Sequence, residues 1–85
     1  MYQLNNPVRI VNRDENLVLV SIPKVELSIE VNENVADFFR FLGKEGRFCE
    51  EHVERYVSER NITNVEDYKE LFQKMIELEV IVELT

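Results

Sequence analysis

One cysteine and one histidine, Cys49 and His52, are the residues of this chain whose types and spacing most resemble a chemical site. Three positions apart on a helix, they would lie on one side of it and could share a metal ion. Two ligands do not complete a metal site, and no nearby pattern supplies the others. A free cysteine usually packs as a small apolar side chain. We therefore expect no metal, cofactor or nucleophilic role here.

Two acidic pairs, Glu50-Glu51 and Glu66-Asp67, are the remaining candidates for acid and base catalysis. Catalytic carboxylates need apolar pockets that shift their pKa, whereas these pairs fall on exposed helix faces or at helix starts, where acids favour the helix dipole. The two glycines, Gly43 and Gly46, match no phosphate-binding loop and predict a turn. The sequence thus predicts a protein that is not an enzyme.

Charge and composition also disfavour several classes of function and location. Seventeen acidic and ten basic residues give a formal charge of −7, which disfavours binding to a nucleic-acid backbone. The single cysteine excludes an internal disulfide, and the polar opening Met-Tyr-Gln-Leu-Asn-Asn does not resemble a signal peptide. No apolar run approaches the length of a membrane span. We expect one cytoplasmic domain over residues 1–85, with no membrane association.

The first third of the chain alternates apolar and other residues at a period of two, which predicts three strands. A polar stretch, Arg13-Asp14-Glu15-Asn16, separates the first two, and Pro23 with Lys24 precedes the third. The third strand has two distinct faces, with Val25, Leu27, Ile29 and Val31 on one and Lys24, Glu26, Ser28 and Glu30 on the other. One face should meet a core and the other water.

At Asn32 the period changes to about 3.6, which predicts a helix capped by Asn32 and ended by Gly43. A second short amphipathic helix is expected from Arg47 to about Glu59. The segment Thr63-Asn64-Val65-Glu66 matches a capping box for a third helix that runs to about Leu78. The β-type run Val80–Leu84 follows. The predicted fold is α+β and winged-helix-like, with a three-stranded antiparallel sheet, then three helices and a short C-terminal strand as an option.

Two features exceed what folding requires. The apolar arc of the third helix is wide, with Leu71, Met75 and Leu78 on one flank and Val65, Phe72 and Ile76 on the other. It indicates either a helix packed on two sides or a helix that lines a groove. The third strand, if outermost, could offer an unpaired edge to an added peptide strand, although its charges also suit protection against aggregation.

A resemblance to a known family rests on the stretch Ile29 to Leu42, which is similar to a strand end, helix start and apolar first helix, and on the closing segment Glu66 to Leu84. Over nearly the whole chain, from about Pro7 to Leu84, the sequence resembles PqqD-like domains, the recognition elements of ribosomally synthesised and modified peptides. It departs from the family where Val31 replaces a frequent leucine and Glu79 a common glycine.

The resemblance implies a winged-helix-like domain that binds the leader of a precursor peptide as an added strand. It also implies delivery of that peptide to a modifying enzyme, often a radical S-adenosylmethionine maturase and sometimes a protease or cyclodehydratase. Carried onto this chain, the implied peptide-binding residues are Val25, Glu26, Leu27, Ser28, Ile29, Glu30, Tyr68, Leu71, Phe72, Met75 and Leu78. Periodicity does not decide which flank of the third helix faces the peptide. We favour Leu71, Met75 and Leu78, because methionine suits adaptable surfaces and Phe72 suits a fixed core.

Two other functions remain open from the sequence. A winged-helix DNA-binding regulator would share the fold but would need a basic recognition helix, whereas the third helix carries more acidic than basic residues. A structural subunit could instead pair its own edge strand with a second copy to form a homodimer.

Overall fold

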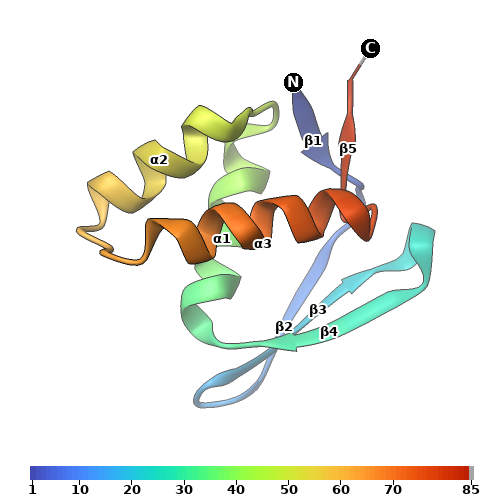
Figure 1. Cartoon of the computed structure of the whole chain (residues 1–85). Helices are drawn as coiled ribbons and strands as arrows, with labels where there is room; N and C mark the ends of the chain where they lie inside the picture. The colour runs from blue at the N-terminus through green and yellow to red at the C-terminus, as the bar shows by residue number, and fades with distance from the viewer. Residues whose placement is uncertain (85) are drawn as a thin grey trace.

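Two small antiparallel sheets and three helices form the protein in its computed structural model, which describes residues 1–84 (Figure 1). The first sheet has the strand order β2-β3-β4, with β2 at Arg9–Asp14, β3 at Leu17–Ile22 and β4 at Leu27–Val31. The second pairs β1, Tyr2–Leu4, with β5, Ile81–Glu83. The predicted α+β class, with three antiparallel strands before three helices, is confirmed.

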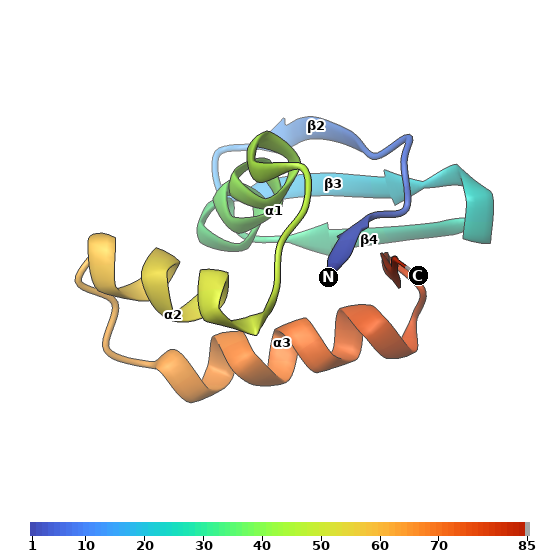
Figure 2. The ribbon, with the colours of Figure 1, turned by 90° about the horizontal axis from the view of Figure 1, so that it is seen from above.

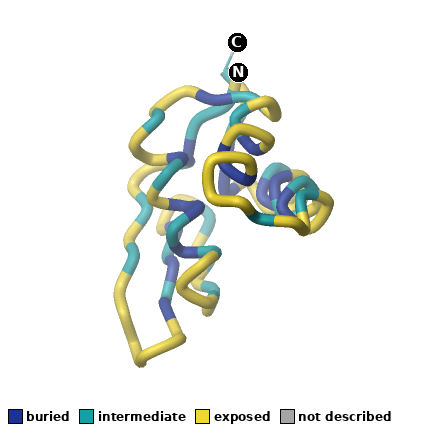
Figure 3. Tube along the Cα trace, turned by 90° about the vertical axis from the view of Figure 1, so that its left-hand side faces the viewer, coloured by how far each residue is buried: buried dark blue, intermediate teal, exposed yellow. Residues whose placement is uncertain are grey.

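The helices follow the three-stranded sheet in the chain: α1 at Glu33–Glu45, α2 at Glu50–Glu59 and α3 at Val65–Glu77. Figure 2 shows α1 against one side of the sheet, with α2 and α3 packed together beyond it. Their apolar stripes meet in one core, to which β3 contributes Val20 and Ile22, α1 Phe38, Phe39 and Leu42, and α2 Val53 and Tyr56. In Figure 3 the tip of the β2–β3 hairpin is exposed, and buried and exposed residues alternate along the helices.

The predicted third strand begins two residues too early. Val25 ends a short 3₁₀ turn, η1, at Pro23–Val25, and Glu26 adopts the left-handed conformation with φ 52°. Pro23 fixes the first φ of this turn, and the Glu26 N–H donates to the Pro23 carbonyl oxygen at 3.1 Å. Val25 and Glu26 therefore lie outside the strand, which starts at Leu27.

The predicted end of the first helix is also wrong, because α1 continues through Gly43 to Glu45. Gly46, with φ 79°, is the residue that needs glycine's freedom, and its N–H donates to the Leu42 carbonyl oxygen at 3.1 Å. Gly43 instead lies against Leu4, where an added Cβ would be 3.5 Å from the leucine side chain. The predicted Asn32 cap is confirmed, since its Oδ1 accepts from the Val35 N–H at 2.9 Å.

Two helix starts lie later than predicted. The second helix begins at Glu50 because Phe48 pairs with Tyr2 through two backbone hydrogen bonds, of 2.7 and 2.9 Å. The third helix is capped at Asn64 instead of Thr63, and the Asn64 amide donates to the Asp67 carboxylate at 3.0 Å. The β-type run at the end of the chain is confirmed as β5, whereas its partner β1 was not predicted.

Candidate functional site

Strand β4 forms one edge of the three-stranded sheet. It pairs with β3 from Val18↔Val31 to Ile22↔Leu27, and within residues 1–84 no strand pairs with its other side. In Figure 2 the strands succeed one another as β2, β3 and β4, and α3 lies beyond β4. The unpaired backbone groups of β4 thus point to the side of the molecule on which α3 lies.

The face that β4 shares with the core is only partly covered. On β3 the inward residues Val18, Val20 and Ile22 are at most 1% exposed. Their partners on β4, which are Val31, Ile29 and Leu27, are half-buried although they share the same face of the sheet. The core therefore buries the inward side chains of β3 completely and those of β4 only in part. Ser28 and Glu30, on the opposite face, are exposed.

The predicted α3 residues divide between the core and the surface. Tyr68, Phe72 and Met75 are buried, at 7%, 1% and 2% exposed. Their spacing of four and then three residues forms a single inward stripe. Leu71 is half-buried and Leu78 is 41% exposed.

The flank of α3 that we favoured as the peptide-binding side, Leu71, Met75 and Leu78, is therefore divided between the core and the surface. Met75 packs in the core, where its predicted role as an adaptable contact has no open surface, while Leu71 and Leu78 remain accessible. Phe72 meets Tyr2 edge-on, with ring centroids 5.6 Å apart, and Phe48 at 6.1 Å. Aromatic contacts on two sides hold this ring in the interior. We use the name β4 site for the partly covered or exposed apolar residues among those considered on the two elements, which are Leu27, Ile29 and Val31 of β4 and Leu71 and Leu78 of α3.

A pocket of about 610 Å³ lies at the end of β4, among the N-terminal turns of α1 and α3 and the C-terminal end of α2. Its lining begins at Asn32, the residue after β4, and includes Leu71 of the β4 site. The lining residues are Asn32, Glu33, Asn34, Val35, Asp37, Tyr56, Arg60, Ile62, Asn64, Asp67, Tyr68 and Leu71. Of these, only Tyr68 and Leu71 were predicted as site residues, because the pocket joins segments distant in the sequence.

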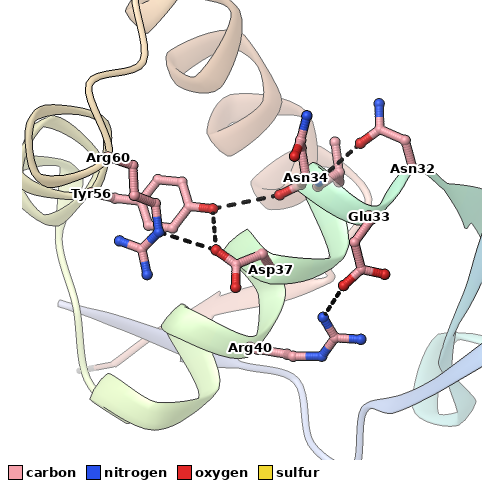
Figure 4. Close-up of polar contacts among 8 residues, drawn as sticks. Asn32, Glu33, Asn34, Asp37, Arg40, Tyr56 and Arg60 are labelled. Carbon is pink, nitrogen blue, oxygen red and sulfur yellow. Dashed lines mark hydrogen bonds and ion pairs between the residues drawn. The ribbon is translucent and has the colours of Figure 1, made fainter. Parts of the chain in front are cut away.

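Hydrogen bonds organise one wall of this pocket (Figure 4). Asp37 of α1 accepts at Oδ2 from the Tyr56 hydroxyl at 2.8 Å and from Nε of Arg60 at 3.1 Å. The Arg60 guanidinium also lies 4.0 Å from the centre of the Tyr56 ring, a cation–π contact. Burial, followed by the hydrogen bond to Asp37, raises the pKa of the Tyr56 hydroxyl well above its ordinary value. The hydroxyl thus stays protonated and acts as a donor.

The cysteine and the histidine lie together at the start of α2. Nδ1 of His52 accepts the Cys49 backbone N–H at 3.1 Å and lies 3.5 Å from the cysteine sulfur. Within residues 1–84, no three His, Cys, Asp or Glu side chains come together as metal ligands. The geometry is that of a helix cap at the start of α2.

The surface of α3 that faces away from the core is predominantly acidic, with Glu66, Glu70 and Glu77 beside Lys69 and Lys74. Lys69 lies 2.9 Å from Glu54, and this hydrogen bond raises the pKa of the lysine. Its charge is thus opposed by neighbouring carboxylates.

None of the helices described for this chain is long and apolar enough to span a membrane. Comparisons with protein families, curated proteins and solved structures found no match.

Proposed function

We propose that this protein binds an extended peptide, which adds a strand to the free edge of β4. The observation that carries this proposal is the combination of an unpaired edge with a half-open apolar face on the same strand. An added strand would satisfy the outward N–H and C=O groups of Leu27–Val31. Alternate peptide side chains would then lie against Ile29 and Leu71. They would bury the inward face of β4, as the core already buries that of β3.

We take the class of peptide in this proposal from the resemblance to PqqD-like domains. The ligand is the leader region of a ribosomally made precursor, and the protein presents it to a modifying enzyme, with a radical S-adenosylmethionine maturase as the expected partner. The order of elements from β2 to α3, three antiparallel strands followed by three helices, supports the assignment. The proposed setting is the cytoplasm, consistent with a single cysteine. The protein itself performs no catalysis in this scheme.

Binding to DNA is the less favoured function. A winged-helix regulator inserts a basic helix into the major groove, and its affinity depends on neutralising phosphates. The acidic surface of α3 and the charge of −7 oppose that contact. Self-pairing of two β4 edges would use the same unpaired groups as the peptide, so it is a competing occupant of the β4 site.

The test is an NMR titration of labelled protein with a synthetic leader peptide, taken from a short precursor gene beside this gene. We expect the amide signals of Leu27–Val31 to shift together with those of Leu71 and Leu78. Shifts confined to α2 would contradict the proposal. A dimer that forms through β4 without peptide, and dissociates on dilution, would favour self-pairing.

A matched pair of variants separates the two faces of the strand. Ile29→Ser, on the face toward α3, should weaken peptide binding, whereas Glu30→Ser, on the exposed face, should leave it unchanged. Both proteins should stay folded, because Ile29 is only half-buried and Glu30 is exposed. Equal affinities for the two variants would argue against strand addition at this face.

A further inference from the structure

Strand β2 forms the second free edge of the three-stranded sheet. Figure 2 places it on the side away from α3, and within residues 1–84 no strand pairs with its outer side. Four large apolar residues of the described chain are exposed, and two of them, Val11 at 53% and Leu17 at 37%, lie on the β2–β3 hairpin. The β2 edge therefore combines unpaired backbone groups with uncovered aliphatic side chains.

A bulge brings the charges of β2 to one face of the sheet. The β3 partners of Arg9, Val11 and Asp14 are residues 21, 19 and 17, which alternate with the buried residues of β3. The three β2 side chains therefore share the outer face, away from the core. Arg13 has no partner on β3 and is the extra residue of the bulge. Without it, positions 9 and 14 would lie on opposite faces, because they are five residues apart.

The two charged residues of this face, Arg9 and Asp14, are exposed and have no ion-pair partner within the described chain. The Asp14 carboxylate accepts one hydrogen bond at Oδ1, from the Glu15 N–H at 2.6 Å. Charged side chains on an edge strand often discourage pairing with other chains. Here they have opposite signs and flank an exposed aliphatic side chain, Val11. Such an edge is complementary to a strand that carries the same pattern in reverse order.

A second copy of β2 carries that pattern. Arg9 and Asp14 each lie two ladder positions from Val11, one on either side. When two β2 strands run antiparallel about a twofold axis at Val11, Arg9 of each copy therefore lies opposite Asp14 of the other. Opposite charges directly across an antiparallel pair stabilise it. Val11 of each copy lies opposite Val11 of the other, and Leu19 extends this aliphatic row on both sides.

The β4 edge offers no such charge pairing. When Ile29 is set opposite Ile29 of a second copy, Glu30 lies opposite Ser28, and no cation meets the carboxylate. Charge complementarity therefore favours β2 over β4 as the edge that pairs with a second copy.

We infer that β2 pairs with β2 of a second copy and forms a symmetric dimer with a continuous six-stranded sheet. The strand order is β4-β3-β2-β2-β3-β4, so both β4 edges stay free and lie about 24 Å apart, across five intervals of about 4.8 Å. The inference goes beyond the proposed function and does not depend on it. If each β4 edge binds a peptide, the dimer is bivalent.

The dimer is weak, because it is held by one short strand from each copy. Such a contact belongs with the small interfaces, which bury less than about 1,200 Å². Arg13 is next to Asp14 in the chain and opposes part of its charge. We expect a dissociation constant on the order of 100 µM.

The first experiment is sedimentation equilibrium of the whole protein at concentrations from about 10 µM to about 1 mM. We expect a monomer–dimer equilibrium that weakens when the salt concentration rises, because the charge pairs are exposed. A protein that is still monomeric at about 1 mM would overturn the inference and leave the proposal of peptide binding at β4 unaffected.

The second experiment reverses the charges. Arg9→Asp alone and Asp14→Arg alone each set two pairs of like charges against each other, so each should raise the dissociation constant about tenfold. A mixture of the two variants sets opposite charges against each other at both contacts, so its heterodimer should match the natural dimer within about twofold. Failure of the folded variants to form this heterodimer would refute the pairing of Arg9 with Asp14.

The control Arg47→Asp alters an exposed arginine outside the sheet. It should keep the natural dissociation constant, and it should form no stronger heterodimer with Asp14→Arg than the natural protein does. Should Asp14→Arg not fold, the comparison of Arg9→Asp with Arg47→Asp decides alone, and equal dissociation constants for these two would refute the inference. A dimer that Ile29→Ser dissociates and Arg9→Asp does not would form through β4, which would also overturn it.

Discussion

Adjacent positions on α3 offer a sharp test, because Phe72 and Leu71 differ in burial although they are neighbours in the sequence. Phe72 is 1% exposed and contacts two aromatic rings, whereas Leu71 is half-buried in the β4 site. We predict that Phe72→Ala mainly destabilises the fold. Leu71→Ala should mainly weaken peptide binding.

The sizes of the two effects follow from burial. Truncating a buried phenylalanine costs about 3–5 kcal/mol, against roughly 4–13 kcal/mol of total stability for a domain of this length. The melting temperature of Phe72→Ala should therefore fall by at least about 12 °C. Full burial of a leucine is worth about 1.5–3 kcal/mol, so Leu71→Ala should cost about 1 kcal/mol and lower the melting temperature by about 4–8 °C. Lost contact with the peptide should reduce affinity about fivefold.

Circular dichroism melts and calorimetric titration with the leader peptide, run on both variants, measure the two quantities. If Leu71→Ala unfolds the protein while Phe72→Ala stays folded and loses the peptide, the orientation of α3 described above is wrong. The binding surface would then have to include Val65, Phe72 and Ile76.

Three further predictions concern local structure. Glu79 has φ 60°, a backbone conformation that glycine adopts without strain, so Glu79→Gly should raise the free energy of unfolding by about 0.5–1 kcal/mol in denaturant titration. The control Glu77→Gly, within α3, should lower the free energy of unfolding by about 1 kcal/mol. If Glu79→Gly does not stabilise the protein, the backbone strain assigned to Glu79 is refuted. Asn32→Ala should lower the free energy of unfolding by about 1 kcal/mol, because it removes the side chain that caps α1. Asn34→Ala lies beyond the cap, and an equal loss of stability in that variant would contradict the assignment of Asn32 as the cap. Because burial raises the pKa of Tyr56 in the folded state, the unfolded state releases that proton first, so stability should be complete below pH 10.0 and fall above it. The stability of Tyr56→Phe should fall less over the same pH range. If the stabilities of the two proteins depend on pH in the same way, ionisation of Tyr56 is excluded as the cause.

Much of the fold was accessible from periodicity. The alternation of Leu27, Ile29 and Val31 predicted a strand with two different faces, and Asn32 predicted the start of α1. These signals are local, since they depend on residues a few positions apart. The resemblance placed a binding surface on β4 and α3, and the structure brings Leu27, Ile29 and Val31 to a half-open edge.

The rest depends on contacts between distant segments. The pairing of β1 with β5 joins the two ends of the described chain, and Phe48 delays α2 because it pairs with Tyr2. The contacts of Asp37 with Tyr56 and Arg60 link α1 to the end of α2, a relation that no spacing reveals. Met75 was assigned to the surface by residue type, but the packing of α3 turns it inward. The pocket depends on the same long-range contacts.

Hydrogen exchange at the backbone of β4 tests strand addition most directly. In an antiparallel pair, alternate residues of Leu27–Val31 donate to β3 and the others point outward from the edge. In the free protein, we predict slow exchange for the first set and rapid exchange for the second. Saturation with the leader peptide should slow the outward set at least about tenfold and leave the amides of the exposed β2–β3 turn unchanged. Rapid exchange of the outward β4 amides in the fully bound complex would contradict peptide binding by β-strand addition.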